Sequence, residues 1–263
     1  MKTESSRTIP HLRWIVCGLL FLASSINYID RQTLSVLKPH LQDLYRWSES
    51  DYGWIVFSFQ AAYAIMMVFS GRIIDRIGTK PGYALAIACW SLAAMAHALA
   101  RGVFSFGLAR FLLGAGEAGN FPAAIKTTAE WFTKKERAFA TGIFNAGTNV
   151  GAVIAPPIVV WLTLEWGWRA AFVFTGAVGF AWLALWLVVY RPPEAHPWLA
   201  KEELALIKSD SEEAAPKPQR PWKSILRIRK AQGFILAKFM TDPICRFLSS
   251  GSRPTSRPSA DSR

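Results

Sequence analysis

The chain is short of charge and of metal-ligating side chains. Asp, Glu, Lys and Arg make up only 18% of its 263 residues, against roughly a quarter in ordinary soluble domains. Its three cysteines (Cys17, Cys89 and Cys245) stand far apart, and it has only four histidines. This spacing indicates neither a disulfide framework nor a metal site, and we expect no cofactor.

Hydrophobic residues instead make up 52% of the chain. A transmembrane helix needs about 20 consecutive, mostly apolar residues. Six stretches meet this condition, approximately residues 14–37, 52–72, 82–100, 104–125, 140–163 and 170–190. The sequence therefore predicts an all-α membrane protein in which six transmembrane helices form one domain over residues 14–190.

The net charge of +12 is compatible with nucleic acid or anionic lipid as a partner, so its placement matters. Nineteen Lys and Arg lie on one side of the six spans, in the segments 1–13, 72–80, 126–137 and 191–230. The other side has only four, which are Lys38, Arg46, Arg101 and Arg169. Because cytoplasmic loops are enriched in Lys and Arg, we expect residues 1–13 in the cytoplasm of a multi-pass protein of the cell (inner) membrane. The positive charge thus reflects topology, and no nucleic acid partner is expected.

The residues after the sixth span change in character. Residues 191–232 are polar and contain six prolines, which indicates a cytoplasmic central linker. Short helices at the membrane face and an ordinary interdomain linker remain equally compatible with it. Residues 233–244, "GFILAKFMTDPI", resemble the start of a seventh helix. The Ser- and Arg-rich residues 245–263 cannot cross a bilayer, and we expect an aberrant tail from a frameshift or early stop, or else a disordered one.

Four ionisable residues lie within the spans: Asp30 and Arg31 in the first, Arg110 and Glu117 in the fourth. Such residues are costly in a membrane and usually face a cavity or a partner. Arg110 and Glu117 are seven residues apart and so share one helix face. Two interpretations stay open. The charges form an ion pair that joins the first and fourth helices, or the carboxyl group carries a proton while an arginine holds an anion.

The fifth span carries a polar patch, Asn145 and Asn149, within "GIFNAGTNVGAVIAPP". Gly and Pro at this density are also typical of a bent helix that packs closely against its neighbours. We therefore consider Asn145 and Asn149 only as possible cavity-lining residues.

The loop between the second and third spans, "GRIIDRIGTK", holds five residues in a specific pattern: Gly71, Asp75, Arg76, Gly78 and Lys80. It resembles the Gly-x-x-x-Asp-Arg-x-Gly-x-Arg/Lys loop of the major facilitator superfamily. The stretches "INYIDRQTLS", "ARFLLGAGEAGNFPAAIKTTAEWF" and "NVGAVIAPPIVVWL" are similar to its anion:cation symporter branch, and within that branch to hexuronate transporters. The resemblance covers about residues 10–240 and implies the N-terminal, six-helix half of a twelve-helix fold.

The resemblance also implies roles. Asp30 and Glu117 match carboxylates that are protonated during symport, and Arg31, Tyr63 and Arg110 match positions that contact the anionic substrate. The loop motif would serve in gating.

The implied activity is proton-coupled uptake of a sugar acid such as galacturonate or glucuronate, by a chain that lacks its second half. Alternatives are a symporter for another organic anion (galactonate, glucarate or an aromatic acid) and a non-transporting membrane fragment or interaction protein. A membrane-embedded enzyme would need a nucleophile–base or metal constellation, and none of the histidines has such a partner in sequence. The oligomeric state stays open.

Overall fold

The computed structural model describes residues 8–209, 228–229, 232–233 and 236–237. The chain divides into two compact units, Met1–Glu213 and Ala214–Arg263, and the helical bundle belongs to the first. The second unit includes the expected start of a seventh helix, residues 233–244, and the tail. Residues 245–263, and most of residues 210–244, lie outside the described ranges.

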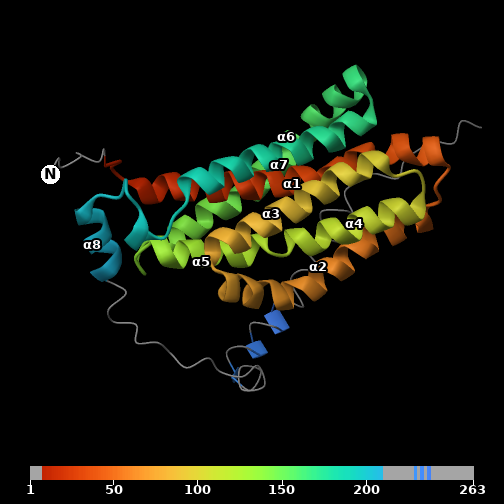
Figure 1. The fold of residues 1–263 in the computed structure, drawn as a ribbon. Helices are drawn as coiled ribbons and strands as arrows, with labels where there is room; N and C mark the ends of the chain where they lie inside the picture. Colours follow the sequence, from red (N-terminus) through yellow and green to blue (C-terminus); the bar gives the residue numbers. More distant parts are fainter. Residues whose placement is uncertain (1–7, 210–227, 230–231, 234–235, 238–263) are drawn as a thin grey trace, which may run out of the picture. The chain divides into compact units, whose positions relative to one another are not determined.

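The first unit is a bundle of long helices (Figure 1). Its elements are α1 (Leu12–Tyr45), α2 (Glu49–Ile77), α3 (Thr79–Ala96) with the 3-10 turn η1 (His97–Leu99), α4 (Val103–Glu117), α5 (Asn120–Trp131), α6 (Arg137–Trp166), α7 (Trp168–Val189), the 3-10 turn η2 (Pro193–Ala195) and α8 (Lys201–Ser209). Five of the described helices are long and apolar enough to cross a membrane: α1, α2, α3 with η1, α6 and α7. The predicted all-α membrane fold is confirmed.

The fourth predicted span is broken. It consists of α4 and α5, which follow one another along the bundle in Figure 1 and are separated only by Ala118 and Gly119. A Cβ on Gly119 would come within 2.7 Å of the Ala86 Cβ on α3, so the chain at this break lies too close to α3 for a larger residue. Glu117 is consequently the last residue of α4.

The first helix is longer than its apolar window, because it continues through Pro39 to Tyr45. Proline removes one backbone hydrogen bond and usually ends or kinks a helix. Here the last turns pack into a core that includes Leu37 and Leu41, both almost fully buried. Tertiary packing thus outweighs the local preference.

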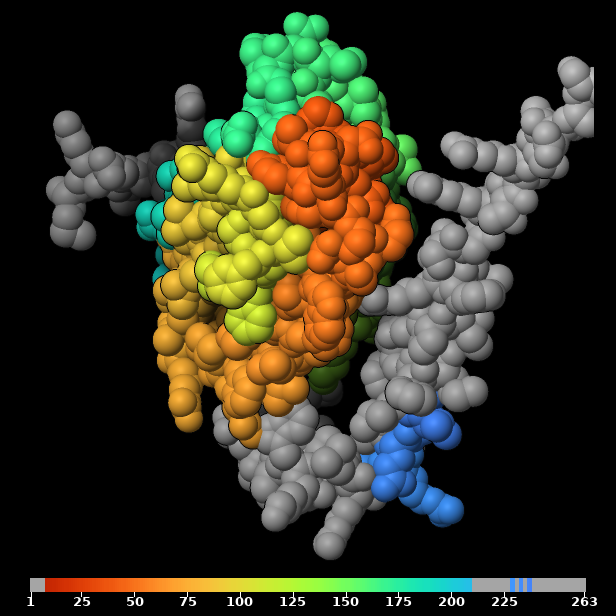
Figure 2. Space-filling view, turned by 90° about the vertical axis from the view of Figure 1, so that its right-hand side faces the viewer, coloured from red at the N-terminus to blue at the C-terminus, as the bar shows by residue number. Residues whose placement is uncertain are grey.

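Aromatic rings pack at the end of the bundle where α1 ends. Figure 2 shows this end, with the segments near residues 45–50 (orange-red) beside those near residue 100 (yellow). Tyr45 stacks on Trp47 at 5.5 Å, and Trp47 meets Phe106 edge-on at 4.8 Å. The Tyr45 hydroxyl donates a hydrogen bond to the Ala100 carbonyl oxygen at 3.3 Å. These contacts join the ends of α1, η1 and α4.

The other end of α1 is held by α8. The Glu203 carboxylate accepts hydrogen bonds from the backbone N–H groups of Leu12 and Arg13, at 3.2 and 3.3 Å. The Arg13 guanidinium bridges Glu203 at 3.1 Å and Glu136 at 3.2 Å. An acidic side chain at a helix N-terminus satisfies backbone donors that have no partner within the helix. The described part of residues 191–232 therefore includes a short helix that packs on the bundle.

Close contact between α1 and α6 depends on glycine. A Cβ on Gly147 or Gly151 would overlap the backbone carbonyl groups of Phe21 and Ser25, respectively. Small residues let membrane helices approach to backbone contact, which strengthens their packing. Gly142, in the same helix, has no neighbour within 4 Å of such a Cβ.

We predict that Gly151→Leu destabilises the bundle by about 1–3 kcal/mol, since the added side chain forces α1 and α6 apart. Gly142→Leu is the matched control, because its side chain enters open space, and it should leave stability unchanged. Thermal denaturation of the two variants in detergent, followed by size-exclusion chromatography, compares them. Equal melting temperatures would contradict the proposed contact.

Candidate functional site

A polar cavity of about 200 Å³ lies between α1, α2 and α4. Its polar lining comprises Tyr28, Arg31, Gln32, Ser35, Tyr52, Gln60 and Arg110. Two cations thus share one cavity among the membrane helices, where such groups ordinarily mark a substrate or ion pathway.

Arg31 is bound on two sides. Its Nε donates to the Glu117 Oε2 at 2.5 Å, and this side-chain pair joins α1 to α4. Its guanidinium carbon also lies 4.6 Å from the ring centre of Tyr63 and 5.1 Å from those of Tyr28 and Phe59. Aromatic faces attract a cation and do so more strongly where water is excluded. The rings and the carboxylate together fix the guanidinium at the cavity wall.

Glu117 is fully buried, whereas the Arg31 side chain keeps 24% of its exposure. The second carboxylate oxygen of Glu117, Oε1, meets no donor at ordinary hydrogen-bond geometry among the described residues. The pair is therefore accessible from the cavity only through Arg31. Of the two interpretations of the buried charges, an ion pair between the first and fourth helices is what the structure contains.

Arg110 contacts the first helix through a backbone carbonyl. Its Nη2 donates to the carbonyl oxygen of Arg31 at 3.2 Å, and its guanidinium carbon lies 5.8 Å from the Phe59 ring centre. The side chain is 5% exposed and lines the cavity. Since Arg110 enters none of the ion pairs among the described residues, its positive charge remains available to an anion.

Asp30 faces away from this cavity, although it precedes Arg31 directly. It is 2% exposed, and neither carboxylate oxygen meets a donor at ordinary geometry within the described ranges. Successive residues of an α-helix point about 100° apart, so Asp30 and Arg31 enter different environments. An ionised carboxylate without partners is strongly disfavoured in such a place, and the neutral acid suits it better.

The loop motif lies at the C-terminal end of α2, whereas the residues of α2 that line the polar cavity lie nearer its N-terminal end. Gly78 connects α2 to α3 alone, with φ of +91°, a conformation that favours glycine. Asp75 forms an ion pair with Lys126 of α5 at 2.9 Å. The Lys126 ammonium also donates a hydrogen bond to the Ile74 carbonyl oxygen at 3.3 Å. The motif therefore joins α2 to α5. Lys126 is its essential partner, which the motif alone did not single out.

The remaining motif residues have other surroundings. The Lys80 carbonyl oxygen accepts from the Trp186 indole at 3.1 Å, a Cβ on Gly71 would lie 4.0 Å from Pro122, and Arg76 is exposed. Asn145 and Asn149 are also exposed on α6 and do not line the polar cavity.

Tyr28, Gln32 and Tyr52 line the cavity without having been singled out as site residues. Tyr28, Arg31, Gln32 and Ser35 follow one another at helical spacing along one face of α1. This polar stripe within an apolar helix is a signal from which Tyr28 and Gln32 could have been predicted.

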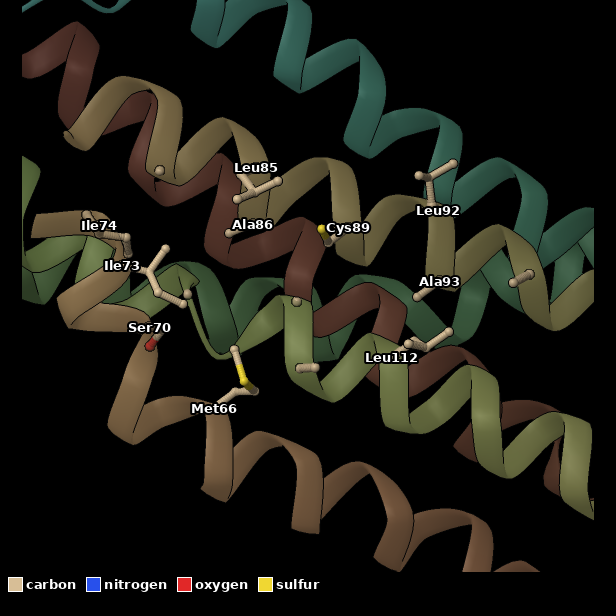
Figure 3. A pocket seen from close by; sticks show the side chains of 15 residues that line it. Met66, Ser70, Ile73, Ile74, Leu85, Ala86, Cys89, Leu92, Ala93 and Leu112 are labelled. Atoms are coloured by element: carbon tan, nitrogen blue, oxygen red, sulfur yellow. The ribbon is translucent and has the colours of Figure 1, made fainter. Parts of the chain in front are cut away.

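A larger crevice of about 480 Å³ lies between α2, α3 and the α4–α5 break (Figure 3). Leu85, Cys89 and Leu92 line one side and Met66 and Ile73 the other. Its lining contains no ionisable carboxylate or basic side chain, so it cannot hold a sugar acid by charge, and the candidate site is the smaller cavity.

The family model of the Major Facilitator Superfamily matches residues 20–250. The chain belongs to the Major Facilitator Superfamily. It is accordingly a multi-pass membrane protein of a family of transporters, and the membrane-embedded enzyme alternative is set aside.

Relatives and a solved structure agree with this assignment. The chain is 35% identical to the "Hexuronate transporter" of Escherichia coli K12 over 90% of its own length and 56% of that protein. It is 35% identical to the "Galacturonate transporter" of Dickeya chrysanthemi over 89% of its length and 69% of that protein. A bacterial homolog of the human lysosomal transporter Spinster, inward-facing and unoccupied, shares the fold with a TM-score of 0.65 and 23% identity over 83% of this chain and 49% of that one. The chain thus spans about half of the length of several of these proteins.

We predict opposite effects for the two buried carboxylates. Glu117→Gln removes the partner of Arg31 and should destabilise the bundle by about 1–3 kcal/mol, less than a fully buried pair would because Arg31 is partly exposed. Asp30→Asn should leave stability unchanged or raise it, since no ion pair is lost. Chemical denaturation in detergent, read from far-UV circular dichroism, measures both variants. A loss for Asp30→Asn as large as that for Glu117→Gln would refute the assigned pairing.

Proposed function

We propose that this chain is the first six-helix half of a proton-coupled symporter that takes up a sugar acid anion of the hexuronate class. The observation that carries the proposal is the Arg31–Glu117 pair at the wall of a polar cavity that also contains Arg110. An anion-binding cation is joined there directly to a carboxyl group that can take a proton. The names of the relatives support a sugar acid as the anion.

Competition between Glu117 and the substrate carboxylate for Arg31 couples the proton to the sugar acid anion. Without a proton, the Glu117 carboxylate occupies the guanidinium at 2.5 Å. A proton on Glu117 removes the negative charge and frees Arg31 for the carboxylate of the substrate. The planar guanidinium groups of Arg31 and Arg110 suit carboxylate binding with two hydrogen bonds each. Proton and anion therefore favour each other's binding in the same cavity.

The sugar hydroxyls need polar partners beside the carboxylate. Tyr63 lies against the Arg31 guanidinium, and Gln32, Gln60 and Tyr52 line the cavity. Amide and phenol groups both donate and accept hydrogen bonds, as hydroxyl recognition requires. Asp30 provides a second carboxyl group, which is buried without a hydrogen-bond donor at ordinary geometry among the described residues and so favours the neutral, protonated form.

The loop motif would gate the cavity from the cytoplasm. The excess of Lys and Arg on its side of the bundle supports a cytoplasmic location for the N-terminus in an inner membrane. The ion pair between Asp75 and Lys126 holds α2 against α5 and would break or shift as the two halves of the transporter rock. The cavity would then open alternately to the two sides.

We predict that Arg110→Lys weakens galacturonate binding by about 10- to 100-fold, since an ammonium group cannot reproduce the fork of a charge-assisted contact. Binding of labelled galacturonate to the purified chain in lipid nanodiscs measures this change. Arg101→Lys, at an exposed arginine outside the cavity, is the matched control and should bind as the parent does.

Unlabelled galactonate, glucarate and benzoate compete with the label in the same assay and rank the substrate classes. Unchanged affinity of Arg110→Lys would remove Arg110 from the site. Stronger competition by one of the other acids than by galacturonate would replace the hexuronate assignment.

We predict that Glu117→Gln abolishes proton-driven accumulation while exchange of substrate for substrate persists, because a neutral amide neither binds nor releases the coupled proton. The assay uses proteoliposomes with a chimera in which this chain precedes the second half of the Escherichia coli hexuronate transporter. Accumulation under an imposed pH gradient and counterflow without one are compared. Equal loss of both modes would assign Glu117 a structural role instead.

A further inference from the structure

Lys38 lies on the same face of α1 as Arg31, seven residues further along and thus about 10 Å away along the helix axis. Its ammonium group pairs with the Glu49 Oε2 of α2 at 2.9 Å, and Gln42 donates to the Glu49 Oε1 at 3.1 Å. Both oxygens of Glu49 are therefore held by side chains of α1. These contacts link the C-terminal part of α1 to the start of α2.

Tyr52 connects this ion pair to the polar cavity. The Lys38 ammonium lies 4.7 Å from the Tyr52 ring centre, and Tyr52 lines the cavity together with Arg31 and Arg110. Ser35, one helical turn before Lys38, is exposed and also lines the cavity. Lys38 accordingly stands at the mouth of the cavity, at the end remote from the Asp75–Lys126 pair.

The two side chains of the Lys38–Glu49 pair differ in their exposure. The Lys38 side chain is 30% exposed, against 78% for Glu49. Ion pairs with an exposed partner contribute little to stability, so an incoming carboxylate can replace Glu49 at little cost. Glu49 also begins α2, where the helix N-terminus stabilises a negative charge even when Lys38 is withdrawn. The neighbouring Asp51 is engaged by the N–H and hydroxyl of Ser48.

We propose that Lys38 forms an outer anion-binding subsite, at which the carboxylate of the incoming sugar acid replaces Glu49 before it reaches Arg31 and Arg110. The identity of the ligand rests on the proposed function, whereas the attraction of anions depends only on Lys38 and Glu49. In the empty protein Glu49 neutralises this subsite. An anion that displaces it meets a cation, an aromatic ring and then two guanidinium groups in order along the cavity.

The proposed subsite would change the rate at which anions enter the cavity. A positive charge at the mouth of a cavity with low-dielectric walls raises the local concentration of anions and their rate of entry, and salt screens this effect. Glu49 tunes the charge, so its removal should make entry of anions faster and loss of Lys38 should make it slower.

Thiol modification at Ser35→Cys tests the subsite without any substrate. The protein is the full chain in nanodiscs at low salt, with Cys17, Cys89 and Cys245 replaced by Ala. Its rates of reaction with an anionic and a neutral methanethiosulfonate of similar size are compared. We expect Glu49→Gln to raise the anionic-to-neutral rate ratio about fivefold and Lys38→Gln to lower it about fivefold, the equivalent of roughly 1 kcal/mol between unit charges 4 Å apart in water.

Two controls separate the subsite from general charge and from misfolding. Arg101→Gln removes an exposed positive charge from the η1–α4 turn and should leave the ratio unchanged. Lys38→Arg keeps the charge and should retain the ratio of the parent. An unchanged ratio in Lys38→Gln, or an equal fall in Arg101→Gln, would overturn the subsite.

Galacturonate distinguishes this proposal from the proposed function. It should slow modification of Ser35→Cys by the neutral reagent, and Lys38→Gln should require a higher concentration for the same protection. Shifted rate ratios without protection by galacturonate would support the anion subsite and count against a sugar acid as its ligand.

Discussion

Arg31 of α1 and Glu117 of α4 place opposite charges 2.5 Å apart within a bundle that spans a membrane. Removal of Arg31 would leave the fully buried Glu117 carboxylate without compensation, whereas removal of Glu117 would leave a guanidinium that is 24% exposed at the cavity wall. The pair therefore determines which rotation of α1 is compatible with α4. It also sets the contents of the polar cavity, since Arg110 reaches the backbone carbonyl of the same Arg31. The same contacts thus link α1 to α4 and place both arginines at the cavity.

Backbone contacts bring Glu117 to this position. A Cβ on Gly116 would lie 2.7 Å from the Trp90 backbone nitrogen of α3, and one on Gly114 would overlap the Phe59 carbonyl group of α2. Small residues thus bring α4 against both neighbours, as is typical of membrane helices that lack a hydrophobic driving force for association. After the interruption at Ala118 and Gly119, α5 continues to Lys126, which pairs with Asp75. One short glycine-rich stretch accordingly connects the buried ion pair to the loop motif.

The fold was largely predictable from the sequence, whereas the cavity was predictable only in part: Arg31 and Arg110 were expected there, and Tyr28, Gln32 and Tyr52 were not. Apolar runs identify the spans, because a bilayer imposes length and hydrophobicity on each helix separately. They do not reveal that α1 continues past Pro39, which depends on the burial of Leu37 and Leu41 by other helices. The pairing of Arg31 with Glu117, rather than with Asp30 beside it, depends on helix rotations that no local pattern records. The glycines around Glu117 were visible, and they carried the signal for the break.

Asp30 and Glu117 lie in different surroundings, so in the proposed symporter the two carboxyl groups would not be equivalent proton acceptors. Under the proposed function, Glu117 would exchange its partner directly with the substrate, because both would compete for Arg31. Asp30 has no partner to exchange at ordinary geometry among the described residues, so its protonation cannot be displaced by the anion at contact distance. Its charge acts on the arginines only through space, in a medium where such interactions are strong. Protonation of Glu117 would then be coupled to anion binding by direct contact at Arg31, and protonation of Asp30 by electrostatic interaction at a distance. Together the two would let the transporter bind the anion in one conformation and release it in another.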